Sequence, residues 1–241
     1  MKNYFLPVLI SLLLCLSCNK DKSEKVVSDT VHYADEELSF AFSTFEEDVN
    51  SKIITPTYRI RVESDTVSFE GFMITFSALD EPLKIFINND TISVQDMFTQ
   101  NCVESEKIQA DYSNMISDIQ YYKDYDFILF KALFYPCTGL GCGVNYQVIY
   151  HTKSKKSFVF GRFRTGFDME LYYYNDEKTY YLSKSYNGRN IQGIDTIRYE
   201  LFRVDFSLQE LKPLDDIFAE TVYDENDNRR IISFTKQWID E

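Results

Sequence analysis

The chain of 241 residues carries 25 Lys and Arg against 38 Asp and Glu, which gives a formal net charge of −13. An acidic chain of this kind repels phosphate backbones, so nucleic acid is excluded as an expected partner. Apolar residues make up 44% of the chain, with 20 Phe and 18 Tyr, and this excludes disorder for its bulk. The length favours a single domain.

The N-terminus has the pattern of a secretory signal peptide. Lys2 precedes a mostly apolar stretch, residues 5–16, that Pro7 interrupts, and a polar run begins at Asn19. A helix that crosses a bilayer needs roughly 20 apolar residues, so this stretch is too short to be a transmembrane anchor. We therefore expect residues 1–17 to be removed as a signal peptide.

The residues that end this stretch, Leu14, Cys15, Leu16, Ser17 and Cys18, resemble the lipobox of bacterial lipoproteins, in which a small residue directly precedes a cysteine. The resemblance covers the N-terminus alone. It implies that Cys18 carries a diacylglyceryl group, that cleavage precedes it, and that the freed amine is acylated. It also implies a lipoprotein of the cell envelope, anchored in the outer membrane and facing the periplasm or the cell surface. Ordinary secretion with an unmodified Cys18 is the alternative.

The residues after the anchor are polar. Residues 19–30 hold three Lys and three acidic residues with few apolar ones, so we expect residues 18–30 to be a lipid anchor with a flexible tether. Two or more acyl chains suffice to hold a protein on a membrane. Residues 31–241 are then a single β-rich domain.

Three cysteines remain in the mature chain. Cys137 and Cys142 lie five positions apart among glycines, and the cell envelope is oxidising, so we expect a small disulfide-closed loop. A redox pair or a zinc site is the alternative, although the spacing is that of neither. Cys102 is expected to be a buried free thiol.

Alternating apolar and polar residues predict strands in the first half of the chain. Residues 57–63 show this alternation. The apolar phase then changes at Glu70 and Gly71, which predicts a β-bulge there. Two further apolar runs flank residues 88–90, which is typical of a hairpin.

One segment has helical periodicity, and we expect a helix over residues 106–121 with Ser105 as its N-cap. The residues on its apolar face are Ile108, Tyr112, Met115, Ile116, Ile119 and Tyr122.

From Asp126 onward the pattern predicts strand after strand. The segments are residues 127–135, 144–151, 156–163, 169–175, 178–186, 196–206 and, past an irregular stretch, 229–238. The first is apolar on both faces, so we expect it to lie centrally with the helix over one side. Short polar separators favour antiparallel meanders. The fold class is mainly β, a sandwich or a curled, barrel-like sheet with about one helix, and a small β-propeller is the alternative.

The sequence contains no recognisable catalytic or metal-binding motif. Only His32 and His151 are available as histidines, and neither belongs to a metal motif. The glycine-rich segment around Cys142 lies between two strands. Its spacing matches neither the G-x-G-x-x-G nor the Walker pattern of phosphate-binding loops. We therefore expect no catalytic residue, metal or cofactor, which favours a binding protein over an enzyme.

Tyrosines are concentrated in one stretch and supply the candidate binding residues, because exposed Tyr stacks well on sugars and at protein interfaces. The alternative is that Tyr is simply a favoured strand residue. The function expected first is a lipid-anchored envelope protein whose β domain binds a glycan, a peptide or a partner protein, or is structural. A carboxylate-dependent hydrolase of polysaccharide and an inhibitor or assembly factor for another envelope protein are the alternatives. The tyrosines are Tyr172, Tyr173, Tyr174, Tyr180, Tyr181 and Tyr186.

Overall fold

The structure is a computed structural model that describes residues 27–29, 35–100, 105–135, 143–164, 172–176, 178–203, 212–223 and 229–238. Within these ranges the chain forms three antiparallel sheets and one α-helix, α1 (Asp35–Ser51), together with three short 3₁₀ turns. The prediction of a mainly β chain is confirmed. The turns are η1 (Val94–Asp96), η2 (Ala110–Tyr112) and η3 (Lys123–Tyr125).

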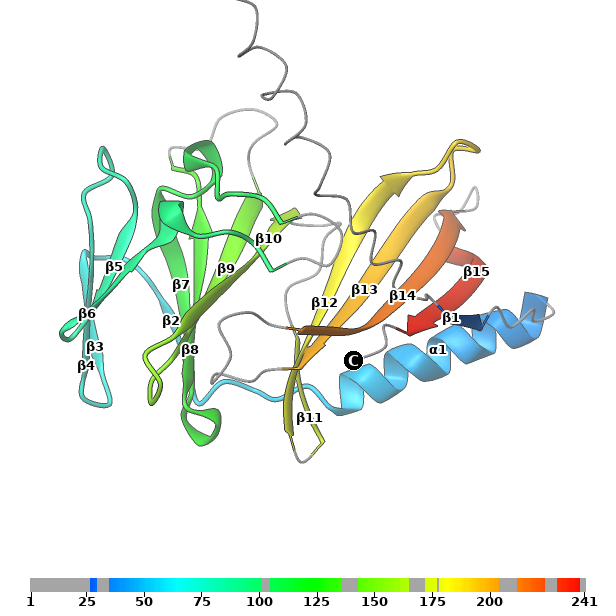
Figure 1. The fold of residues 1–241 in the computed structure, drawn as a ribbon, viewed down its shortest axis with the longest axis horizontal. Coiled ribbons are helices and arrows are strands. Elements are labelled where there is room, and N and C mark those ends of the chain that lie inside the picture. Colours follow the sequence, from blue (N-terminus) through cyan, green and yellow to red (C-terminus); the bar gives the residue numbers. More distant parts are fainter. Residues whose placement is uncertain are drawn as a thin grey trace, which may run out of the picture.

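The sheets contain six, five and four strands (Figure 1). The six-stranded sheet has the order β1 (Val27–Asp29), β15 (Arg229–Trp238), β14 (Lys212–Tyr223), β13 (Asp195–Arg203), β12 (Lys178–Arg189) and β11 (Tyr172–Asp176). The five-stranded sheet has the order β10 (Ser157–Arg164), β9 (Val144–His151), β8 (Phe127–Leu133), β7 (Met115–Tyr122) and β2 (Tyr58–Arg61). The four-stranded sheet has the order β3 (Thr66–Phe69), β4 (Phe72–Phe76), β5 (Lys84–Ile87) and β6 (Asp90–Ser93).

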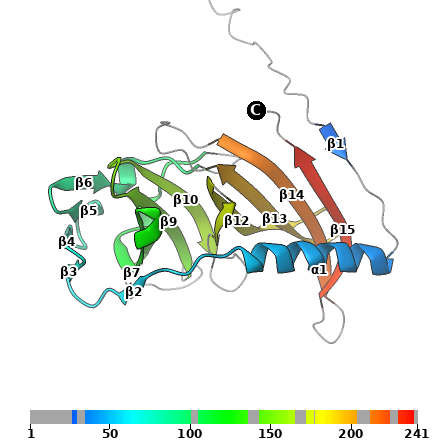
Figure 2. The same ribbon diagram turned by 90° about the horizontal axis from the view of Figure 1, so that it is seen from below.

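The sheets are stacked as layers. The four-stranded sheet covers one face of the five-stranded sheet, the six-stranded sheet covers part of the other, and α1 lies along the outer side of the six-stranded sheet (Figures 1 and 2). One apolar cluster fills each of the three interfaces between layers. This layered arrangement is not the radial arrangement of a propeller.

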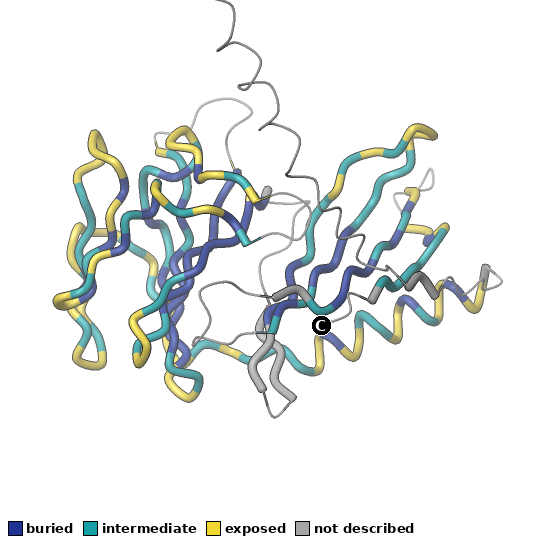
Figure 3. The backbone as a smooth tube through the Cα atoms, viewed as in Figure 1, coloured by how far each residue is buried: buried dark blue, intermediate teal, exposed yellow. Residues whose placement is uncertain are grey.

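The central strand β8 shows why this chain needs two covering layers. Ile128 and Phe130 belong to the apolar cluster beneath the four-stranded sheet, whereas Phe127 and Leu129 belong to the cluster beneath the six-stranded sheet. Alternate residues of a strand point to opposite faces, so apolar side chains at consecutive positions must be covered on both sides. The predicted central position of this strand is confirmed, and Figure 3 shows the buried residues concentrated in this part of the molecule. The prediction that a helix covers one side of this strand is wrong, because a sheet covers each side.

The helix predicted for residues 106–121 does not form, because residues 115–121 belong to β7 and residues 110–112 form the 3₁₀ turn η2. The register of β7 against β8 shifts between Ile116 and Asp118, so one extra residue is inserted there. Ile116 and Ile119 therefore reach the same apolar cluster although they are three residues apart. A strand with such an irregularity copies the spacing of a helix.

The helix that does form, α1, lies in a segment for which no element was predicted. Leu38, Phe42, Phe45 and Val49 follow one another at intervals of four, three and four residues, which is the apolar stripe of a helix. These side chains pack against the six-stranded sheet.

Three smaller predictions also need correction. Glu70 and Gly71 form a two-residue turn, not a bulge, because both have positive φ (45° and 80°) and join the paired residues Phe69 and Phe72. Strand β14 occupies a stretch expected to be irregular. Strand β1 pairs with β15 inside the segment expected to be a flexible tether.

Candidate functional site

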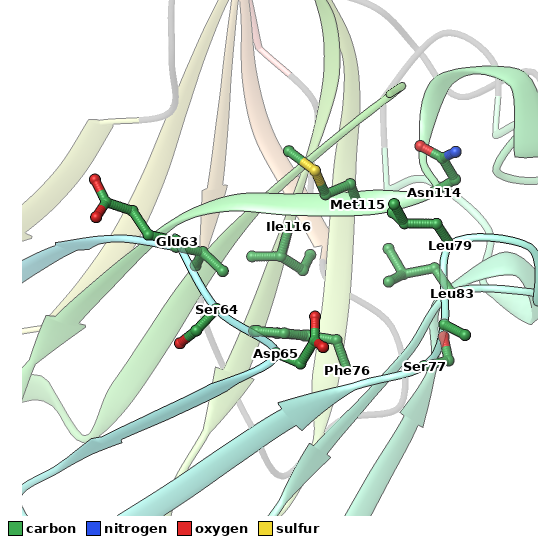
Figure 4. Close-up of a pocket in the computed structure, with 12 residues that line it drawn as sticks. Glu63, Ser64, Asp65, Phe76, Ser77, Leu79, Leu83, Asn114, Met115 and Ile116 are labelled. Carbon is green, nitrogen blue, oxygen red and sulfur yellow. The ribbon is translucent and has the colours of Figure 1, made fainter. Parts of the chain in front are cut away.

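A pocket of about 570 Å³ opens at one end of the layer between the four- and five-stranded sheets (Figure 4). Three chain segments form it: the connection from β2 to β3, the connection from β4 to β5, and the beginning of β7. Residues far apart in the sequence meet here because the two sheets pack face to face. The pocket is lined by Val62, Glu63, Ser64, Asp65, Phe76, Ser77, Ala78, Leu79, Leu83, Asn114, Met115 and Ile116.

The inner part of the pocket is apolar. Leu83 and Ile116 are both 1% exposed and belong to the apolar cluster between the two sheets, and Val62 and Phe76 pack against that cluster. The pocket is therefore the open end of a core layer. At its outer margin Leu79 remains 50% exposed, which is a large exposed fraction for a leucine. Apolar surface of this kind is available to a ligand.

The two serines of the pocket stabilise its own loops. The Ser64 hydroxyl donates to the Thr66 carbonyl at 2.7 Å, and the Ser77 hydroxyl donates to the Pro82 carbonyl at 3.0 Å. The Ser77 oxygen also accepts the backbone N–H of Lys84 at 2.9 Å. These bonds hold the two connections in place and engage the hydroxyl protons.

Asn114 is engaged in the same way. Its amide donates to the Tyr135 carbonyl, and its side-chain oxygen accepts the Tyr135 backbone N–H, both at 2.7 Å.

In contrast, Glu63 and Asp65 are exposed, and neither forms an ion pair or hydrogen bond with a residue that the structure describes. Figure 4 shows the Asp65 carboxylate beside Phe76, whereas the Glu63 side chain extends away from the other labelled side chains. Two negative charges beside an apolar cavity favour a ligand with a positive charge.

A second pair of carboxylates lies in the six-stranded sheet. Glu200 and Asp216 are cross-strand partners, and both bind the guanidinium of Arg198, whose Nε is 3.2 Å from the Glu200 carboxylate. Burial raises the pKa of Asp216, although Arg198 acts in the opposite direction. Because one buried guanidinium engages both carboxylates, the geometry is that of an internal ion pair that joins two strands.

The predicted tyrosine cluster is divided. Tyr181 is fully buried between the five- and six-stranded sheets, so it is a core residue and is not available to a ligand. Tyr186 is half-buried and donates a hydrogen bond to Asp195 at 2.7 Å. Neither Tyr181 nor Tyr186 lines the pocket. The side chains of Tyr172, Tyr173, Tyr174 and Tyr180 lie outside the described part of the structure, as do Cys18, Cys102, Cys137 and Cys142.

His151 ends β9, and its Nδ1 accepts the backbone N–H of Ser154 at 3.1 Å. Burial lowers the pKa of this histidine.

In the described part of the chain, no three His, Cys, Asp or Glu side chains are grouped so that they could hold a metal ion. The same part contains no helix that is long and apolar enough to cross a membrane.

Sequence reasoning predicted a strand over residues 57–63 and missed the pocket. The available signal was the pair Glu63 and Asp65 on either side of a serine, but most of the apolar partners come from segments 11 or more residues further along the chain.

A comparison of the chain with protein-family models, with curated proteins and with solved structures finds no match.

Proposed function

We propose that this protein is a lipid-anchored protein of the cell envelope whose β domain binds a ligand without catalysis, and that the ligand occupies the pocket between the four- and five-stranded sheets. The lipobox-like residues before Cys18 support the anchor. The pocket supports the binding function, because an apolar cavity with a few charged groups at its margin is the usual form of a small-molecule site.

The observation that carries the proposal is that some polar side chains of the pocket are bonded within the protein and others are not. The serines and Asn114 are engaged in bonds within the protein, and the inner wall is apolar. Glu63 and Asp65 are the charged groups left to face a ligand. The ligand is therefore amphipathic, with an apolar body and a positively charged group.

The same arrangement argues against glycoside hydrolysis. That reaction needs two carboxylates on either side of the scissile bond. Glu63 and Asp65 come from one connection, and the Glu63 side chain extends away from the other labelled side chains of the pocket (Figure 4). The geometry therefore favours binding over the hydrolase alternative.

Three probes with the same body test the ligand class: 4-phenylbutylamine, 4-phenylbutanol and 4-phenylbutyrate. Each is titrated into the purified full-length protein, and amide chemical shifts are followed by NMR. We expect the amine to bind most tightly and the acid least, with shifts concentrated at residues 62–65, 76–83 and 114–116. Equal affinity for the three probes, or shifts elsewhere, would contradict the proposal.

Variants then assign the charges. Glu63→Gln and Asp65→Asn should each weaken amine binding about fivefold, which corresponds to about 1 kcal/mol for an exposed ion pair, and should leave alcohol binding unchanged. Ala78→Trp fills the pocket mouth and should abolish binding of all three probes. Glu47→Gln, on the exposed side of α1, is the matched control and should bind like the unchanged protein.

A further inference from the structure

The second candidate surface is the free edge of the five-stranded sheet, strand β2. This strand pairs with β7 on one side and is the last strand of its sheet on the other. Tyr58, Arg59 and Arg61 are exposed, and Ile60 packs against the core beneath the four-stranded sheet. An open strand edge presents backbone N–H and C=O groups to which another extended chain can bind.

The register identifies which backbone groups face outward. The Val62 N–H, just after β2, donates to the carbonyl of Ser117 on β7 at 2.9 Å. Bonded positions alternate along an antiparallel pair, so Ile60 also directs its backbone groups towards β7, whereas at the start of the strand the Thr57 N–H donates to the Tyr121 carbonyl. The N–H and C=O groups of Arg59 and Arg61 therefore face away from the sheet. They provide two donors and two acceptors with the spacing of an antiparallel partner strand.

The side chains of this edge select the partner. Arg59 and Arg61 lie on the same face, and neither guanidinium forms an ion pair with a residue that the structure describes. Directly opposed side chains of two paired strands interact, and opposite charges stabilise the pair whereas like charges destabilise it. A partner strand with acidic residues at alternate positions meets this requirement.

A second copy of this chain does not meet it. Two β2 strands joined antiparallel through their outer edges would place Arg opposite Arg. The same feature prevents edge-to-edge aggregation, for which proteins commonly place charges on edge strands. We propose that β2 is a docking edge for an extended acidic peptide segment of another protein, which adds to the five-stranded sheet as a sixth strand through the backbone of Arg59 and Arg61.

The test uses a capped peptide of the composition Thr-Glu-Val-Glu-Val-Thr and a counterpart with Lys in place of Glu. Binding to the full-length protein is measured by NMR at low salt. We expect the acidic peptide to bind at least tenfold more tightly, to slow hydrogen exchange at the Arg59 and Arg61 amides, and to lose affinity in 0.5 M salt. Equal binding of the two peptides would overturn the proposal.

Two peptide controls separate strand addition from simple charge attraction. In the proposed register the Glu residues pair with Arg59 and Arg61, so N-methylation of the Glu amides removes the bonding N–H groups and should abolish binding. N-methylation of the Val amides, which face away, should leave affinity unchanged. If both methylated peptides bind equally, the edge is an electrostatic patch and the strand-addition proposal is wrong.

Protein variants complete the test. The double variant Arg59→Glu and Arg61→Glu should reverse the preference, so that it binds the Lys peptide and rejects the Glu peptide by tenfold or more. Lys84→Glu is the matched control, because Lys84 is an exposed side chain on β5, which has strand neighbours on both sides. It should leave both affinities unchanged. A dimer of the unchanged protein that the double variant abolishes would assign the edge to a second copy and overturn the proposal.

Discussion

The carboxylate of Glu46 joins α1 to three strands, and neutralising it should destabilise the protein. Glu46 Oε1 accepts a hydrogen bond from Lys184 Nζ on β12 at 2.9 Å and another from the Tyr199 hydroxyl on β13, also at 2.9 Å. The Arg229 guanidinium on β15 binds both carboxylate oxygens. Burial acts to raise the pKa of Glu46, but the bonds from Arg229 and Lys184 outweigh it and lower this pKa to about 2.

The size and the sign of the effect follow from this pKa. A carboxyl whose pKa falls from 4.5 to about 2 on folding contributes about 3 kcal/mol to the free energy of unfolding. Because the pKa of the folded state is the lower one, the contribution is complete above pH 4.5 and is lost as the pH falls towards about 2. Protonation of Glu46 in this range leaves the partly exposed side chains of Lys184 and Arg229 without their shared anion.

Urea unfolding between pH 2 and pH 7 measures this contribution. Glu46→Gln should lower the free energy of unfolding by about 2–3 kcal/mol at pH 7 and by almost nothing at pH 2, so the acid limb of its stability curve should be flatter. The control Glu47→Gln changes a neighbouring exposed carboxylate and should follow the unchanged protein. If Glu46→Gln and the unchanged protein lose stability in parallel between pH 4.5 and pH 2, the reasoning is refuted.

Three further outcomes are expected. Cys18→Ala should abolish incorporation of radiolabelled lipid and leave the protein soluble or uncleaved; normal labelling would exclude Cys18 as the lipid site. Mass analysis without reduction should find one disulfide between Cys137 and Cys142, and a bridge to another cysteine would contradict the loop. Phe42→Ala should cost about 3–5 kcal/mol, because its ring is fully buried. Phe40→Ala, at a ring 75% exposed, should change stability little, and similar losses would show that α1 is not docked.

Local signals predicted the hairpins and most strands correctly. Every segment after residue 126 that was predicted as a strand overlaps one, and residues 144–151 and 229–238 match β9 and β15 at both ends. The hairpin of β5 and β6 formed around Asn88, whose φ of 52° suits a tight turn. These features depend on alternation and turn chemistry between near neighbours, which a single sequence carries.

The apolar periodicity predicted the wrong element where the packing of a strand produced the spacing of a helix. The spacing of Ile116 and Ile119 is helical in the sequence but arises from an irregularity in β7, which only the register against β8 reveals. Strand β14 lies in a stretch that was expected to be irregular, and its Asp215 and Asp216 are both buried and bind cations on neighbouring strands, Lys236 and Arg198. Burial of an acidic residue depends on a partner that lies elsewhere in the chain.

The sequence by itself determined the class of the fold and the position of several turns, because each depends on composition or on short-range pattern, and the anchor at Cys18 stays a prediction of the same kind. Only the tertiary structure decided where the candidate binding surfaces lie. The carboxylates of Glu63 and Asp65 meet the apolar wall at Leu83 and Ile116 because two sheets pack face to face, and β2 is an edge because no other described strand pairs with its outer side. Both are properties of long-range packing, which alternation along the chain does not encode.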